Sequence, residues 1–172
     1  MVRRAAGILC MAVAALAQLA RAAEPALQQP VEPLRITTLG GSEITALSER
    51  GHILVINLWA TWCVPCRQEM PALDVFAIKY GAHGVDVIAV SMDDRSDLAQ
   101  VRQVMSAYSF PAALAADSDL RGLGRVRHIP ATFVIDRNGL LARNGWQQPA
   151  SIDLATLENM LRPLLGAAGE QR

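Results

Sequence analysis

Two cysteines separated by two residues are the part of this sequence best suited to chemistry. They are Cys63 and Cys66, within the run Trp62-Cys63-Val64-Pro65-Cys66. A disulfide that closes so short a loop constrains the unfolded chain very little, so a purely structural crosslink explains the pair poorly. The spacing indicates a reactive pair, in which the redox disulfide Cys63–Cys66 alternates with a dithiol.

Metal binding is the competing explanation for this pair. A zinc site needs two further ligands, and the histidines His52, His83 and His128 have no metal-ligand spacing with one another or with the cysteines. A copper-delivery site would favour a wider cysteine spacing and a clearly placed histidine. We therefore expect no metal and no cofactor.

The two cysteines have different expected roles because of their places along the chain. Cys63 falls between an apolar strand expected over 52–59 and a helix expected over 64–80. At such a junction the unpaired amides and the positive end of the helix dipole stabilise a thiolate, so Cys63 is the predicted nucleophile. Cys66 lies one turn further in and is predicted to resolve a mixed disulfide. Pro65 stiffens that turn.

Strand and helix patterns alternate around the pair. Leu34–Thr38 and Glu43–Leu47, separated by two glycines, predict a small hairpin ahead of the strand over 52–59. Pro71 is expected to kink the helix over 64–80. The later expected elements are a strand over 85–92, a helix over 97–108, a short strand over 110–115, a short helix over 119–126, a hairpin over 131–136 and 140–146, and a closing helix over 152–165. This order predicts an α/β sandwich.

The N-terminus has the pattern of an export signal. Arg3 and Arg4 precede an apolar run over 5–20, and small residues follow over 20–23. The apolar run is slightly shorter than the ~20 residues that a spanning helix needs. We therefore interpret residues 1–22 as a signal peptide that directs the protein to the periplasm, with an uncleaved membrane anchor as the alternative.

The rest of the chain predicts one domain. Residues 23–33 are expected to form an extended, proline-containing leader with no role in the core, residues 34–166 the folded domain, and residues 167–172 a disordered tail. Of the 16 basic and 16 acidic residues, three arginines and no acid lie in residues 1–22, so the mature protein is slightly acidic. This balance does not favour nucleic-acid binding, and a monomer is expected.

Two longer segments carry a family resemblance. Residues 57–71, with the sequence NLWATWCVPCRQEMP, resemble the active-site segment of the thioredoxin superfamily, most closely that of its exported TlpA/ResA-like branch. The resemblance continues through residues 129–139, with the sequence IPATFVIDRNG, and covers residues 34–165 in all. It implies a thioredoxin-like fold with a central mixed sheet, helices on both faces and an N-terminal β-hairpin.

The resemblance also implies a substrate-binding surface. It predicts that Pro130 follows a cis peptide bond and packs beside the cysteine pair, where the Ile129 backbone offers strand-like hydrogen bonds to a substrate segment. We expect Trp62 to be partly exposed in this docking surface. The predicted substrate-binding residues are therefore Trp62, Pro65, Ile129 and Pro130.

A third candidate catalytic residue is Glu69. Cytosolic thioredoxins carry a buried aspartate six residues before the first cysteine, whereas this chain has Asn57, which cannot accept a proton from Cys66. Glu69 lies three residues after Cys66 on the same helical face, and ResA-like proteins have a glutamate at this place. A carboxylate in a partly apolar setting could accept the proton of Cys66. The alternative is a surface glutamate that favours the first helical turn.

The preferred function is the reduction of disulfides in exported proteins with cysteine pairs. Cys63 attacks, Cys66 resolves, and the oxidised protein is reduced again by a membrane thiol-relay partner, as the resemblance also suggests. The resemblance implies that the clients are apocytochromes c or copper-site proteins.

Other functions remain open at this stage. A disulfide-donating oxidase would use the same fold in the opposite direction, although the span over 91–111 has room for only one ordinary helix, which argues against the large oxidase type. A copper chaperone or another binding module is a further alternative. A peroxidase is disfavoured, because Ala60 stands three residues before Cys63, where that chemistry would place a threonine.

Overall fold

The computed structural model describes residues 25–147 and 152–166. The expected export segment over 1–22 and the expected tail over 167–172 lie outside these ranges. Within the described ranges, no helix combines the length and the apolar character needed to cross a membrane. The strands are β1 (Arg35–Thr37), β2 (Glu43–Thr45), β3 (Ile53–Trp59), β4 (Val85–Ser91), β5 (Ala112–Leu114), β6 (Ala131–Ile135) and β7 (Leu141–Arg143). The α-helices are α2 (Val64–Tyr80), α3 (Leu98–Met105) and α4 (Leu154–Leu165).

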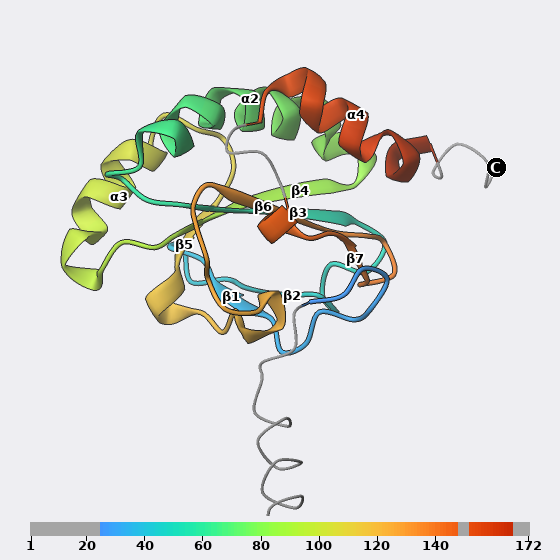
Figure 1. The fold of residues 1–172 in the computed structure, drawn as a ribbon. Coiled ribbons are helices and arrows are strands. Elements are labelled where there is room, and N and C mark those ends of the chain that lie inside the picture. The colour runs from blue at the N-terminus through green and yellow to red at the C-terminus, as the bar shows by residue number, and fades with distance from the viewer. Residues whose placement is uncertain (1–24, 148–151, 167–172) are drawn as a thin grey trace, which may run out of the picture.

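Five of the strands form a mixed sheet in the order β5-β4-β3-β6-β7, and β1 and β2 pair separately as the expected hairpin (Figure 1). All seven residues of β3 are buried, as expected for a continuous apolar strand at the centre of a sheet. β3 runs parallel to β4, with Trp59 opposite Ser91, and antiparallel to β6. The loops that follow Trp59 and Ser91 therefore emerge side by side, at the carboxyl ends of these two parallel strands.

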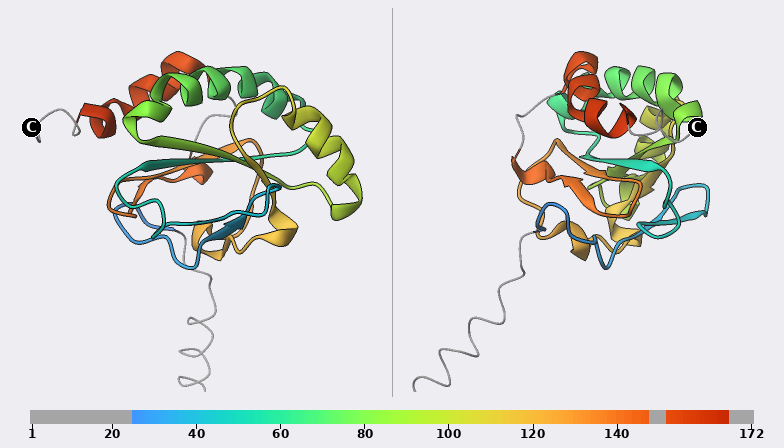
Figure 2. Two further views of the ribbon diagram at one scale, coloured as in Figure 1. Left: turned by 180° about the vertical axis from the view of Figure 1, so that it is seen from behind. Right: turned by 90° about the vertical axis from the view of Figure 1, so that its right-hand side faces the viewer.

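The three α-helices pack on one face of the sheet. Phe76 of α2, Val101 of α3 and Leu157 of α4 belong to one buried apolar cluster. The β1–β2 hairpin covers the opposite face together with short 3-10 turns (Figure 2). The predicted mixed sheet with helices and an N-terminal hairpin is confirmed, and the helical cover of the second face consists of 3-10 turns alone within the described residues.

The α-helix expected over 119–126 is absent. A single 3-10 turn over Arg121–Leu123 takes its place. A Cβ at Gly122 would lie 2.8 Å from the carbonyl oxygen of Pro33, and Gly124 has φ +77, so both positions depend on glycine. Glycine also weakens a helix, which explains why the turn does not extend. α3 is likewise shorter than its expected range of 97–108.

The proposal that residues 23–33 have no role in the core is wrong. The Gln28 amide donates to the Leu141 carbonyl at 2.8 Å, and the Leu141 amide donates to the Gln29 carbonyl at 2.9 Å. Val31 is 2% exposed and belongs to the apolar cluster on the second face. β7 would otherwise present an open edge, so the extended segment completes the sheet there.

α2 has the bounds that its sequence predicts. It begins at Val64, ends at Tyr80 and continues through Pro71, where the sequence predicts a kink. After β6, Gly139 has φ +81 but Asn138 has no positive φ, so a two-residue Asn-Gly turn with positive φ at both residues does not form. The Asp136 amide donates to the Leu140 carbonyl at 2.8 Å and closes a three-residue loop over 137–139. β7 ends at Arg143, earlier than expected, and a 3-10 turn over Gly145–Gln147 follows.

Candidate active site

The cysteine pair lies at the junction that the sequence predicts. Cys63 is the N-cap of α2, with extended backbone angles, and its Sγ accepts a hydrogen bond from the Cys66 amide at 3.3 Å. The two residues form a disulfide with a Cα–Cα distance of 5.3 Å. Cys63 is 5% exposed and Cys66 is fully buried, so a substrate can reach only Cys63. Once the disulfide is reduced, the same amide can stabilise a Cys63 thiolate.

A buried carboxylate, Asp93, holds the loop in front of Cys63. Thr61 donates to it twice, from its amide at 2.9 Å and from its hydroxyl at 2.6 Å. The Ser91 hydroxyl also donates to Asp93, which is 5% exposed. These contacts join the loop after β3 to the loop after β4. Sequence reasoning missed Asp93, although an acidic residue directly after a buried strand beside β3 is a usable signal.

Glu69 is buried below the cysteines. It lies one turn after Cys66 on α2 and is 2% exposed, so the alternative of a surface glutamate is wrong. Its carboxylate accepts from Asn57 Nδ2 at 2.6 Å and from the Ile152 amide at 3.2 Å. Burial raises the pKa of Glu69 from 4.5 to about 7, and the two hydrogen bonds oppose this rise only in part.

Asn57 joins Glu69 to the strand that follows Pro130. Besides its bond to Glu69, Asn57 Nδ2 donates to Thr132 Oγ1 at 3.0 Å. Thr132 lies in β6, antiparallel to β3 and directly opposite Asn57. The peptide bond between Ile129 and Pro130 is cis, in agreement with the expectation for this position. The two sequence segments that carried the family resemblance are therefore neighbours in the fold.

An open, largely apolar groove lies beside this segment. Its volume is about 440 Å³, and it is lined by Trp62, Met92, Val126, Arg127, His128 and Ile129. Trp62 is 69% exposed, as expected for a docking residue, and Pro65 is exposed as well. Of the groove residues, the sequence predicted Trp62 and Ile129. The others were missed because they come from loops whose relation to the cysteines depends on the fold.

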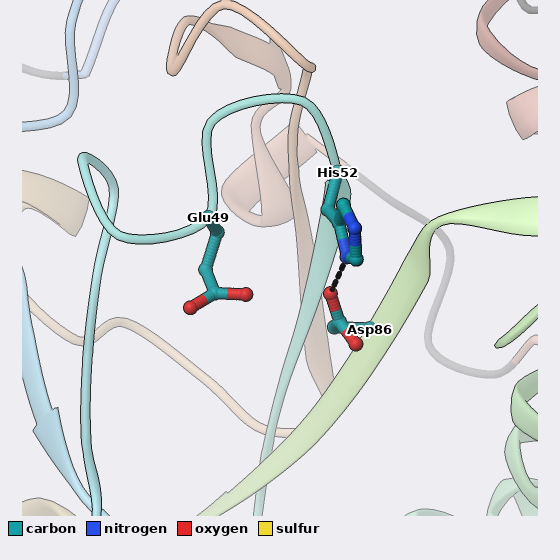
Figure 3. Close-up of side chains that lie close together, drawn as sticks. All are labelled: Glu49, His52 and Asp86. Carbon is teal, nitrogen blue, oxygen red and sulfur yellow. Dashed lines mark hydrogen bonds and ion pairs between the residues drawn. The ribbon is translucent and has the colours of Figure 1, made fainter.

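A second cluster of polar side chains lies at the other end of β3 and β4. His52 Nδ1 contacts Asp86 Oδ2 at 2.6 Å, and ligand-type atoms of Glu49, His52 and Asp86 lie within 4.8 Å of one another (Figure 3). Such a group could hold a metal ion, yet the side chains of His52 and Asp86 are 53% and 43% exposed. The hydrogen bond between His52, just before β3, and Asp86 of β4 accounts for the observed contact.

Comparison with known proteins places the chain among thioredoxin-like sequences. ResA of Bacillus thuringiensis (strain Al Hakam), a thiol-disulfide oxidoreductase by name, is 34% identical over 106 residues, which cover 60% of each chain. The thioredoxin-like protein YneN of Bacillus subtilis is 32% identical over 120 residues, which cover 66% of this chain and 67% of that protein. The chain thus spans about 60% of the length of the ResA relatives that it matches.

Solved structures share the fold. A thiol:disulfide interchange protein of the thioredoxin family from Chlorobium tepidum superposes with a TM-score of 0.68 at 23% identity, covering 84% of this chain and all of that one. The AhpC/TSA family profile matches residues 27–143, a range that includes Cys63, Cys66 and every strand from β1 to β7. On this match the chain belongs to the AhpC/TSA family, and its architecture is thioredoxin-like.

Proposed function

We propose that this protein is a thiol–disulfide oxidoreductase that reduces disulfides in client proteins through Cys63 and Cys66. The observation that carries the proposal is the Cys63–Cys66 disulfide at the N-terminus of α2, next to an open groove and one turn from the buried carboxyl of Glu69. The ResA relatives, which are named thiol-disulfide oxidoreductases, support this activity.

The reaction exchanges two electrons between two disulfides. The Cys63 thiolate attacks one sulfur of the client disulfide, which forms a mixed disulfide and releases the other client sulfur as a thiolate that takes up a proton. Cys66 loses its proton and attacks the Cys63 sulfur. This step forms the Cys63–Cys66 disulfide and releases the second client thiol. The client is reduced, and the protein is oxidised.

Glu69 is the group that we assign to the proton of Cys66. A carboxyl with a pKa of about 7 is present in both protonation states at neutral pH, so it can accept a proton and release it again. Asn57 and the Ile152 amide hold its two oxygens in place. Neither of these groups can itself take up the proton.

The location and partners of the reaction form a further part of the proposal. The export pattern in residues 1–22 supports a periplasmic protein, either released or anchored through residues 5–20. In an oxidising compartment the disulfide must be reduced again with electrons from across the membrane, which requires a membrane thiol-relay partner. Exported proteins with cysteine pairs, such as apocytochromes c or copper-site proteins, are the proposed clients, and a monomer is the proposed form.

A trapping experiment tests the mechanism. In Cys66→Ala the resolving sulfur is missing, so the full chain should accumulate client proteins linked to Cys63 that dithiothreitol releases. Cys63→Ala is the matched control and should trap nothing. If Cys66→Ala accumulates no mixed disulfide with a model disulfide protein, the proposed order of attack is wrong.

An oxidase remains a second candidate because of one observation. The hydrogen bond from the Cys66 amide to Cys63 Sγ would also stabilise a thiolate, and a more stable reduced form makes a stronger oxidant. The reduction potential of the pair decides between the two directions. A potential near or below about −240 mV supports a reductant, whereas one near about −120 mV would make the protein an oxidase.

A further inference from the structure

Two arginines and a histidine directly precede Ile129 of the groove. Arg125, Arg127 and His128, here called the basic rim, alternate with Val126 directly before Ile129, and all four residues over 125–128 are exposed. Arg127 and His128 line the groove itself. The whole chain has equal numbers of basic and acidic residues, so this concentration of positive charge does not follow from composition.

The side chain of Trp146 holds the basic rim in place. Before it, the Leu123 carbonyl accepts a hydrogen bond from Trp146 Nε1 at 2.6 Å. Within it, the His128 ring contacts the Trp146 ring edge to face, with 5.6 Å between the centroids. Trp146 is 8% exposed, so a buried side chain supports the rim from below. The rim therefore has a defined position relative to Ile129 and the disulfide.

Apart from Arg127 and His128, the residues that line the groove are apolar. Trp62 and Met92 line it, and Trp62 is the most exposed of the large apolar side chains in the described residues. Asp93 follows Met92, but its carboxylate is buried against Thr61 and Ser91 and does not neutralise the rim.

The segments next to the groove also carry charged residues. The first turn of α2 contains no acidic residue, and Arg67 is exposed close after the cysteines. Asp94 follows the buried Asp93 in the loop after β4 and is exposed. Apart from Asp93, it is the acidic residue nearest to Met92 in the sequence. A segment bound in this groove thus meets apolar side chains and, at Arg127, a positive charge.

We propose that this groove selects client segments in which the reactive cysteine is flanked by an apolar residue and by one or more acidic residues. The inference rests on the proposed function and names the substrate class of the same site. Trp62 and Met92 cover the apolar residue, and the basic rim attracts the carboxylates. Charge complementarity of this kind raises the rate of productive encounter and discriminates against basic clients.

The test uses three disulfide-containing peptides that are identical except for two residues beside the reactive cysteine, which are Asp, Gly or Lys. For the reduced full chain, kcat/KM for the Asp peptide should exceed that for the Lys peptide about three- to tenfold at low salt, the size expected for two exposed ion pairs. The preference should shrink at about 1 M salt, where exposed charges are screened. The double variant Arg125→Glu/Arg127→Glu should reverse it.

A matched variant keeps the result specific. Arg50→Glu/Arg162→Glu makes the same change in net charge at exposed arginines that do not line the groove, and it should retain the preference for the Asp peptide. The ratio between peptides is measured on one preparation, so partial unfolding of a variant does not alter it. Equal kcat/KM values for all three peptides, or an equal loss of preference in both double variants, would overturn the proposed selectivity. Failure to reduce even the Gly peptide would overturn the proposed function itself.

Discussion

The two ends of the parallel strands β3 and β4 each hold an aspartate in a different way. At the carboxyl end, Asp93 is 5% exposed and accepts hydrogen bonds from Thr61 and Ser91. At the amino end, Asp86 pairs with His52 in a site where both side chains are about half exposed. The disulfide lies at the first end. The second end has no part in the proposed reaction.

This fold thus places its buried polar contacts where the geometry of the site must be fixed. A buried carboxylate cannot exchange its partners for water, so Thr61, and with it the backbone leading to Cys63, has one arrangement. An exposed pair competes with water and salt and constrains its strands weakly. Stability and chemistry should follow this contrast between the buried and the exposed aspartate.

The largest effect is expected at Asp93. Asp93→Ala removes three accepted hydrogen bonds and leaves the buried amide and hydroxyl of Thr61 without a partner, which should lower the free energy of unfolding by at least about 3 kcal/mol. Urea denaturation of the oxidised protein measures the loss. Asp94→Ala, a change of the exposed neighbour, should cost less than about 0.5 kcal/mol. A loss below 1 kcal/mol at Asp93 would contradict the role given to burial.

Glu69 should make stability depend on pH. Its pKa is raised in the folded protein to about 7, so the native state holds the Glu69 proton more tightly than the unfolded chain. Below about pH 4, Glu69 is protonated in both the folded and the unfolded chain, so its burial does not make stability depend on pH. As pH rises from about 4.5 to 7, the unfolded chain ionises first, and the free energy of unfolding should fall by about 2 to 3 kcal/mol.

Glu69→Gln removes this titration. The free energy of unfolding of the variant, measured by urea denaturation from pH 4 to pH 8, should lack the fall that the wild type shows between pH 4.5 and 7. Gln68→Glu, which places a carboxyl on the exposed neighbour, is the matched control and should leave the fall in place. Parallel curves for wild type and Glu69→Gln would show that Glu69 titrates at its ordinary value.

Local pattern was sufficient for the elements that carry the chemistry. The apolar run of β3, the Cys63 junction and the bounds of α2 were all predicted, because each depends on residues that are close in the sequence. The burial of Glu69 was predicted only in part. Helical spacing places Glu69 on the same face of the helix as Cys66, but its hydrogen-bond partner Ile152 lies 83 residues further along the chain. Helical spacing alone cannot exclude a position on the surface.

Predictions failed where long-range packing decides the structure. The sequence around Val31 predicts an extended leader, because no local pattern shows that this segment pairs with the open edge of β7 and buries Val31. The 3-10 turn at Gly122 depends on the approach of the Pro33 backbone, which no local pattern reveals. Asp93 and the basic rim were missed for the same reason, because strand order brings their loops to the cysteines.

A smaller effect is expected at Arg137, which joins the amino ends of the two strands. Its Nη1 donates to the Gly51 carbonyl at 2.6 Å, and its Nη2 donates to the His83 carbonyl at 2.9 Å. Arg137→Met keeps much of the packing and removes these two bonds and the longer one from Nη1 to the Gly84 carbonyl at 3.4 Å, so the free energy of unfolding should fall by about 1 to 2 kcal/mol. Disulfide exchange by Cys63 should not change. A slower exchange would show that the amino end does contribute to the reaction.

The smallest effect is expected at the exposed pair of His52 and Asp86. A double-mutant cycle with His52→Gln and Asp86→Asn isolates their interaction, which should be below about 1 kcal/mol in urea denaturation and should decline further as salt rises. Glu49→Gln, measured in the same way, should change stability still less, because Glu49 lies near the pair but only His52 and Asp86 are joined by a hydrogen bond in Figure 3. A coupling above about 2 kcal/mol that persists at high salt would be typical of a buried pair. It would mean that an aspartate fixes the strands at both ends. Rigid geometry would then not be special to the end that holds the disulfide.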